Sequence, residues 1–163
     1  MLTVGLIGAG RIGRVHASTI VQDEGSQLVA VADSVDENAK NLAKLYKVNP
    51  RSVDAIFEDN SIEAILIASS TDTHSDFIEK ASIAGKAILC EKPVDLSLAR
   101  AKRCLENTKS NEHSIMMGFN RRFDPNFVAL KNALDGGEIG TAELLSITSF
   151  DPAPPPIDYV KVS

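Results

Sequence analysis

The sequence predicts an α/β protein built on a doubly wound parallel sheet, with the first helix and strand of a second, α+β domain after it. Two observations carry this prediction. Short apolar runs alternate with segments of helical periodicity through residue 119, a pattern typical of βαβ units whose sheet is covered on both faces. The pattern changes after residue 119. We therefore expect one domain over residues 1–119 and the start of another over 120–163.

The expected strands of the first domain are short apolar runs rich in strand-forming residues, at 2–7, 27–33, 63–69, 86–91 and 114–119. Helices are expected where apolar residues recur every three or four positions, at 11–21 and around 39–46, 77–81 and 98–105. Between residues 48 and 57, Pro50 argues against a long strand because proline has no N–H to donate. We expect a short edge strand there, followed by a short helix.

The second domain is expected to begin with a helix. Asp124 is a favourable N-cap and Pro125 a favourable first helical residue, and the pair Gly136-Gly137 ends the helical spacing. Residues 142–150 (AELLSITSF) are expected to form a strand. An isolated strand exposes unpaired edges, so it would pack back on the domain or join copies of the chain into a homo-oligomer. The prolines at 154–156 favour an extended polyproline conformation.

Composition excludes several classes of function. The net charge of −5 argues against broad attraction to nucleic acid or to an anionic membrane. Cys90, Cys104 and the three histidines follow no metal-ligand spacing, so no metal site is expected. The first residues do not resemble a secretion signal, and no apolar run is long enough to span a membrane. We expect reduced thiols and a cytoplasmic protein.

The stretch GLIGAGRIGRVH (5–16) carries the spacing G-x-G-x-x-G, directly after the first strand and at the start of the first helix. Asp33 lies 20 positions after Gly13, at the end of the second strand. Glycines and an acid so placed are typical of a dinucleotide site, where the glycines approach the pyrophosphate and the acid binds the ribose. The acid would repel a 2′-phosphate, so NAD is favoured over NADP. A plain βα turn and a site for S-adenosylmethionine are the alternatives.

Three further segments follow expected strands and should face the nicotinamide half of the cofactor: 69–74, 91–93 and 119–122. In the second of them, Lys92 is restrained by the proline after it. Such a lysine can exchange a proton with a substrate or hold a substrate hydroxyl by its charge; the alternative is a solvated lysine. For His74, a role as a helix cap or packing residue is as well supported as contact with the ligand, and packing is favoured for His16. Cys90 is expected to be a buried thiol.

The motifs GLIGAGRIGRVHA, VAVADS, ILIASSTDTH, ILCEKPVDLSL and MMGFNRRFDPNF, in this order, resemble the glucose–fructose oxidoreductase/inositol dehydrogenase (Gfo/Idh/MocA) family over essentially the whole chain. The resemblance implies hydride transfer from a secondary alcohol of a cyclitol or sugar to NAD. It implies that Lys92 is catalytic. Together with the glycine motif, it makes the following residues candidates for cofactor binding: Gly8, Gly10, Arg11, Ile12, Gly13, Asp33, Ser34, Ser69, Thr71, His74, Glu91, Asn120 and Arg121. Since Arg121 and Arg122 are adjacent, only one of them is expected to point inward.

The resemblance also implies a longer protein, whose second domain is a large antiparallel sheet that carries an Asp and a His of the catalytic group. We therefore expect this chain to be truncated and to lack part of that group. Two functional hypotheses follow. The chain is the nucleotide-binding half of an NAD-dependent polyol dehydrogenase, or it is a stand-alone NAD-binding module without catalysis.

Overall fold

The structure, a computed structural model, describes residues 1–110, 113–150 and 153–154. The chain divides into two compact units, Met1–Gly118 and Phe119–Ser163, called unit 1 and unit 2 below.

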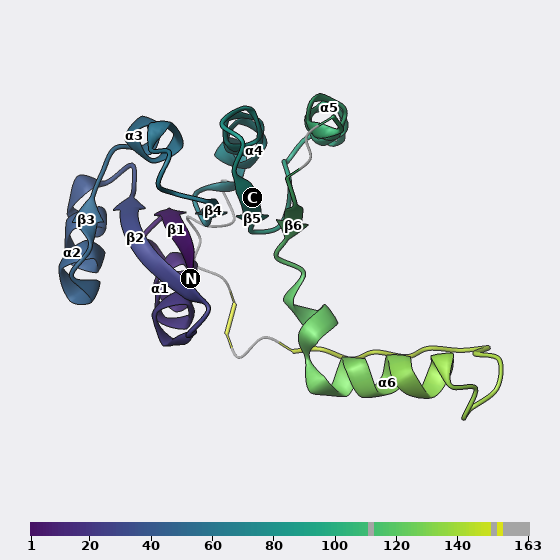
Figure 1. The fold of residues 1–163 in the computed structure, drawn as a ribbon. Coiled ribbons are helices and arrows are strands. Elements are labelled where there is room, and N and C mark those ends of the chain that lie inside the picture. Colours follow the sequence, from purple (N-terminus) through teal and green to yellow (C-terminus); the bar gives the residue numbers. More distant parts are fainter. Residues whose placement is uncertain (111–112, 151–152, 155–163) are drawn as a thin grey trace. The chain divides into compact units, whose positions relative to one another are not determined.

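Unit 1 is built on a six-stranded sheet in which all neighbouring strands are parallel (Figure 1). The order is β3-β2-β1-β4-β5-β6. The strands are β1 (Leu2–Ile7), β2 (Ser26–Ala32), β3 (Asn49–Pro50), β4 (Ala64–Ile67), β5 (Ala87–Cys90) and β6 (Ile115–Met117). The order reverses between β1 and β4, which is the switch point where open α/β sheets bind ligands. The predicted doubly wound parallel sheet is therefore confirmed.

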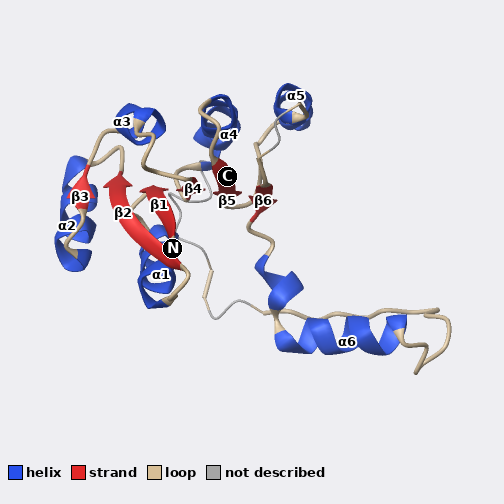
Figure 2. Ribbon diagram, viewed as in Figure 1, coloured by secondary structure: helices blue, strands red, loops and turns tan. Residues whose placement is uncertain are grey.

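Helices cover both faces of this sheet. They are α1 (Arg11–Gln22), α2 (Asp36–Tyr46), α3 (Val53–Glu58), α4 (His74–Ile83) and α5 (Leu98–Thr108), with a 3-10 turn η1 (Thr71–Thr73) before α4. The first two lie on one face and the other three on the opposite face (Figure 2). This division follows from the strand order, because right-handed crossovers that run in opposite directions along a sheet place their helices on opposite faces.

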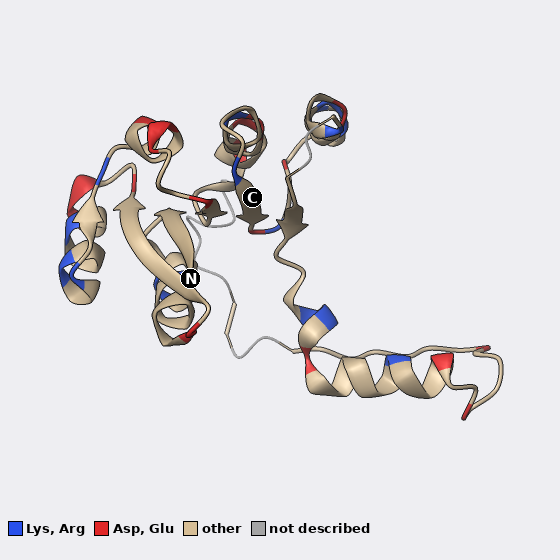
Figure 3. Ribbon diagram, viewed as in Figure 1, with Lys and Arg blue, Asp and Glu red and all other residues tan. Residues whose placement is uncertain are grey.

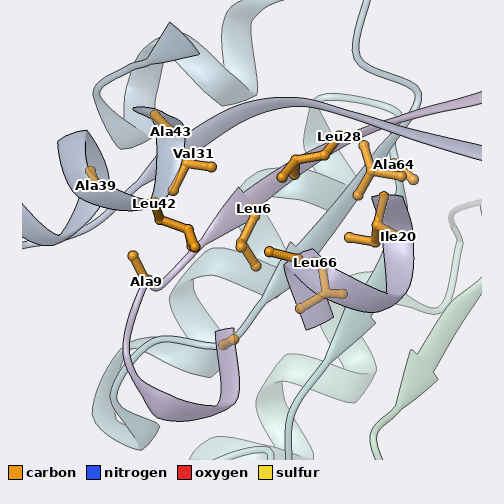
Figure 4. Close-up of a cluster of buried hydrophobic side chains, with 13 residues drawn as sticks. Leu6, Ala9, Ile20, Leu28, Val31, Ala39, Leu42, Ala43, Ala64 and Leu66 are labelled. Carbon is orange, nitrogen blue, oxygen red and sulfur yellow. The ribbon is translucent and has the colours of Figure 1, made fainter. Parts of the chain in front are cut away.

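The core consists of two clusters, one on each face of the sheet. Successive strand residues point to opposite faces, so Leu6 belongs to the first cluster and Ile7 to the second. The first cluster, drawn in Figure 4, joins strand residues to Ile20 of α1 and Leu42 of α2. None of the six strands described in unit 1 contains a charged residue, and the charges that Figure 3 colours in this unit lie on helices and loops.

The short strand β3 is at the edge of the sheet, as predicted from Pro50. Pro50 pairs with Val31 on its one strand neighbour. The N–H of Arg51, the next residue, donates to the carbonyl of Val31 at 2.9 Å. The missing proline donor is tolerated here because an edge strand has a neighbour on one side only.

Unit 2 contains η2 (Asn120–Phe123) and α6 (Pro125–Asp135). The Asp124 carboxylate accepts the N–H groups of Asn126 and Phe127 at 2.9 and 3.4 Å, so the predicted cap is confirmed. The predicted strand at 142–150 is wrong, because these residues form no regular secondary structure and are exposed. A strand needs a hydrogen-bonded neighbour, and the part of unit 2 that the structure describes contains none. Of the predicted polyproline run, residues 155 and 156 lie outside the described residues.

Within the described residues, no helix combines the length and apolar character needed to cross a membrane. The same residues contain no cluster of His, Cys, Asp or Glu suited to a metal ion. Cys90 and Cys104 are free, buried thiols.

Candidate functional site

The motif that joins β1 to α1 contains three glycines, and the packing of the fold itself requires two of them, Gly8 and Gly13. Gly8 has a φ of +104°, and a Cβ on it would lie 2.3 Å from the Ala68 carbonyl oxygen. A Cβ on Gly13 would lie 1.9 Å from the carbonyl oxygen of Gly8. Both positions therefore exclude a side chain. The turn, β4 and the first helix approach one another closely as a result.

Gly10 is different. A Cβ on Gly10 would meet no atom within 4 Å, and its backbone (φ −71°, ψ −164°) is open to any residue. The fold itself does not require glycine here. The open space beside Gly10 is what a pyrophosphate needs in order to approach the backbone.

The N-terminus of α1 faces the same space. Gly10 is its N-cap, no side chain caps it, and its first turn contains no acidic residue. Uncapped N–H groups and the helix dipole together form an anion site. Arg11 and Ile12, two of the predicted cofactor residues, are exposed in this first turn.

Asp33 fixes the turn from the end of β2. One carboxylate oxygen accepts the N–H of Ala9 at 2.6 Å, and the other accepts the N–H of Val35 at 2.8 Å. The Asn38 amide lies 3.5 Å from that second oxygen. The oxygen that accepts the Ala9 N–H has capacity for a further donor, so Asp33 can still accept a hydrogen bond from a hydroxyl of a ribose.

A cavity of about 230 Å³ joins these features at the carboxyl ends of β1, β2 and β4. Five predicted residues line it: Gly8, Gly10, Asp33, Ser34 and Ser69. Six lining residues were not predicted individually: Ile7, Val53, Ala68, Ser70, Thr73 and Phe77. Ser70 and Thr73 belong to the predicted segment 69–74, whereas Val53 and Phe77 are apolar residues of helices and carry no recognisable signal in the sequence.

The segment after β4 is held by its own polar groups. The hydroxyls of Ser69 and Thr73 are 2.7 Å apart. The His74 ring is buried, with Nδ1 2.7 Å from the Pro93 carbonyl oxygen and Nε2 3.1 Å from that of Ser69. Both ring nitrogens are occupied by the backbone, which favours the packing alternative for His74. Thr71 is half-buried at the start of η1.

Glu91 and Lys92 follow β5, the strand next to β4. Lys92 is exposed, and its peptide bond to Pro93 is cis. The Glu91 carboxylate contacts the His16 ring, with 2.8 Å between Oε1 and Nε2, and its other oxygen accepts the Lys92 N–H at 3.3 Å. His16 is thus partly buried against an acid, a contact that the sequence does not predict.

Burial removes Cys90 from the candidate nucleophiles. Its side chain is inaccessible, and burial, with the nearby Glu91 charge and Cys104 as smaller causes, raises the pKa of the thiol to about 12. A neutral thiol is a poor nucleophile. The sequence-based expectation of a core thiol is confirmed.

The other predicted residues belong to unit 2. Asn120 and Arg121 lie in η2, and both are exposed. The Arg121 guanidinium is 5.5 Å from the centre of the Phe127 ring and 3.4 Å from the Ser149 hydroxyl. Their role toward a cofactor stays a prediction.

These features define a dinucleotide-binding Rossmann domain: a parallel sheet of this strand order, a glycine turn, an uncapped helix N-terminus and an acid at the end of β2. The sequence model of the oxidoreductase family with an NAD-binding Rossmann fold (GFO/IDH/MocA) matches residues 2–119, and the chain belongs to this family.

Several relatives of the chain are inositol dehydrogenases. Inositol 2-dehydrogenase of Rhizobium meliloti (strain 1021) is 48% identical over 159 residues, which cover 98% of this chain and 48% of that protein. The crystal structure of a myo-inositol dehydrogenase from Corynebacterium glutamicum matches with a TM-score of 0.92 and 42% identity, over 98% of this chain and 48% of that one.

A scyllo-inositol dehydrogenase from Lactobacillus casei, solved with NAD(H) and scyllo-inositol, matches with a TM-score of 0.78 and 27% identity. The match covers 86% of this chain and 42% of that one. The chain spans about half the length of the curated relatives it matches. It is an inositol dehydrogenase-like, NAD-binding oxidoreductase domain.

Proposed function

We propose that the chain is the nucleotide-binding half of an NAD-dependent polyol dehydrogenase, which oxidises a secondary alcohol of a cyclitol or sugar to a ketone. The observation that carries the proposal is the arrangement around Gly10. Space is left free beside a glycine that the fold does not need, at an uncapped helix N-terminus, with the Asp33 carboxylate at the end of the adjacent strand.

The residues at this site fit a dinucleotide. The first-turn N–H groups of α1 would bind the pyrophosphate, and Asp33 would accept hydrogen bonds from the adenosine ribose. The cavity lining contains no Lys or Arg among the described residues, while it does contain the Asp33 carboxylate. A 2′-phosphate would therefore meet a negative charge without a compensating cation, which favours NAD over NADP.

Lys92 is the candidate for handling the substrate proton. The hydride acceptor in this reaction would be the bound NAD. Lys92 follows the carboxyl end of β5, and its ammonium group would orient the reacting hydroxyl and exchange a proton with it. The proximity of Lys92 to a substrate is supported by the family resemblance and by its position on the nicotinamide side of the switch point.

The second candidate function is an NAD-binding module that does not catalyse. It is favoured by one observation, that the features around Gly10 and Asp33 account for binding of the nucleotide and not for chemistry on a substrate.

Two measurements on the same preparation separate the candidates. Calorimetry with NAD and with NADP measures binding, and the absorbance of NADH measures turnover with myo-inositol and scyllo-inositol. Binding with turnover supports the dehydrogenase. Binding of NAD without turnover supports the module for this chain, and no binding of either nucleotide refutes both.

A further inference from the structure

We propose that His16 is a positioning residue for Lys92, acting through the carboxylate of Glu91. The inference rests on the proposed function only in treating Lys92 as the residue that handles the substrate proton. The contacts themselves are properties of unit 1 and do not depend on a cofactor.

The contact between His16 and Glu91 joins residues 75 positions apart in the chain, with 2.8 Å between Nε2 and Oε1. The two side chains are only 22% and 16% exposed. Solvent therefore screens this pair less than an ordinary surface pair. An ionised carboxylate only accepts hydrogen bonds, so the donor in this contact is the Nε2–H group of His16 and the acceptor is Oε1 of Glu91.

Glu91 is held on two further sides. Its second carboxylate oxygen accepts the N–H of Lys92 at 3.3 Å. Gly118, just after β6, faces the carboxyl group so closely that a Cβ there would lie 3.1 Å from Cδ and Oε1. The N–H of Gly118 donates to the Cys90 carbonyl at 2.7 Å, and this hydrogen bond holds Gly118 beside the Glu91 carboxyl group. The carboxylate therefore has little freedom to leave the Lys92 backbone.

His16 connects this arrangement to the cofactor site, because it lies on α1, the helix whose N-terminus faces the space beside Gly10. Pro93, on the other side of Lys92, is anchored as well, since its carbonyl oxygen lies 2.7 Å from Nδ1 of the buried His74. Lys92 thus stands between two histidine-anchored residues. Of the two anchors, only His16 belongs to the helix that would bind the pyrophosphate.

The first test uses backbone amide hydrogen exchange, measured by NMR on the full chain. His16→Ala removes the donor, and His16→Gln retains an amide N–H near the position of Nε2. Ser18→Ala is the control on the same helix, because the Ser18 hydroxyl contacts Gln22 and not Glu91. The amide of Leu66, in the core of β4, reports on opening of the whole sheet.

We expect His16→Ala to speed exchange at the Lys92 amide about tenfold, the effect of losing one charge-assisted hydrogen bond. Exchange at Leu66 should change much less. His16→Gln should restore most of the protection, and Ser18→Ala should leave it unchanged. Unaltered exchange at Lys92 in His16→Ala would overturn the proposal. An equal acceleration at Leu66 would also overturn it, since His16 would then serve only the stability of the fold.

The second test asks whether His16 affects how NAD protects Lys92 from chemical modification. Reductive methylation of lysines is followed by mass spectrometry with and without NAD, with the exposed Lys44 of α2 as the internal reference. NAD should slow modification of Lys92 severalfold in the wild type, and His16→Ala should lose most of this effect while calorimetry still detects NAD. Equal protection of Lys92 in both proteins would contradict the proposal. If the wild type binds no NAD, the proposed function fails, and the exchange measurement still decides the role of His16.

Discussion

The substitution Gly10→Ala separates what the fold requires from what a cofactor requires. The added Cβ meets no atom within 4 Å, and the backbone angles of Gly10 are allowed for alanine. Alanine is a poorer N-cap than glycine, which lowers the stability by about 0.5–1 kcal/mol. Alanine also restricts the unfolded chain, which raises the stability by about the same amount. We therefore expect the free energy of unfolding to stay within about 1 kcal/mol of the wild-type value.

The same methyl group occupies the space through which a pyrophosphate would approach the N-terminus of α1. Loss of one charge-assisted hydrogen bond weakens binding by about 1.5–3 kcal/mol, or roughly 10- to 100-fold in Kd. We expect Gly10→Ala to weaken NAD binding by at least the lower of these factors.

Gly13→Ala is the matched control, because its Cβ would lie 1.9 Å from the Gly8 carbonyl oxygen. We expect that variant to lose about 3 kcal/mol or more of stability. Chemical denaturation measures the stability of each variant, and calorimetry measures NAD binding. The reasoning is refuted if Gly10→Ala binds NAD as tightly as the wild type does, or if Gly13→Ala is as stable as Gly10→Ala.

Four other predictions concern three side chains, Asp33, Cys90 and Glu79. Asp33→Asn removes the negative charge and places an amide N–H2 opposite one of the two backbone N–H donors, so calorimetry should find NAD binding weakened about tenfold and the preference over NADP reduced. Cys90, whose thiol pKa burial raises from 9.0 to about 12, should react with iodoacetamide far more slowly in the native than in the unfolded chain. Since the unfolded thiol ionises first, this group should lower the free energy of unfolding as the pH rises from 9.0 toward 12, an effect absent from Cys90→Ala. Hydrogen bonds from Arg100 hold the pKa of Glu79 below its usual 4.5, so Glu79→Gln should cost about 1–2 kcal/mol at neutral pH, and less as the pH falls and the wild-type carboxylate protonates.

Unit 1 could be predicted from the sequence because local patterns and global fold agree there. Its apolar runs are short and separated by helical periodicity, and a parallel sheet buries such runs on both faces. Pro50 marked the edge strand because the proline ring removes one backbone donor. The glycine spacing and Asp33 predicted the nucleotide site because they report local properties. Glycine leaves space beside the backbone, and Asp33 places a charge at the end of a strand.

Other features depend on contacts that a local pattern does not contain. The alternation of Leu145 and Ile147 suggested a strand, but a strand also needs a neighbour, and the described part of unit 2 offers none. The His16–Glu91 contact depends on how helix α1 lies against the end of β5, which is set by the whole sheet. From the sequence, a cap or packing role for His74 was as well supported as contact with a ligand, and only its burial between two carbonyl oxygens favours packing.

The most direct test of the central claim is a calorimetric titration of the full chain with NAD, repeated with NADP and with the Gly10→Ala variant. The account predicts one NAD bound per chain, weaker binding of NADP, and weaker binding of NAD by Gly10→Ala. A chain that is folded by circular dichroism and binds neither nucleotide would contradict it.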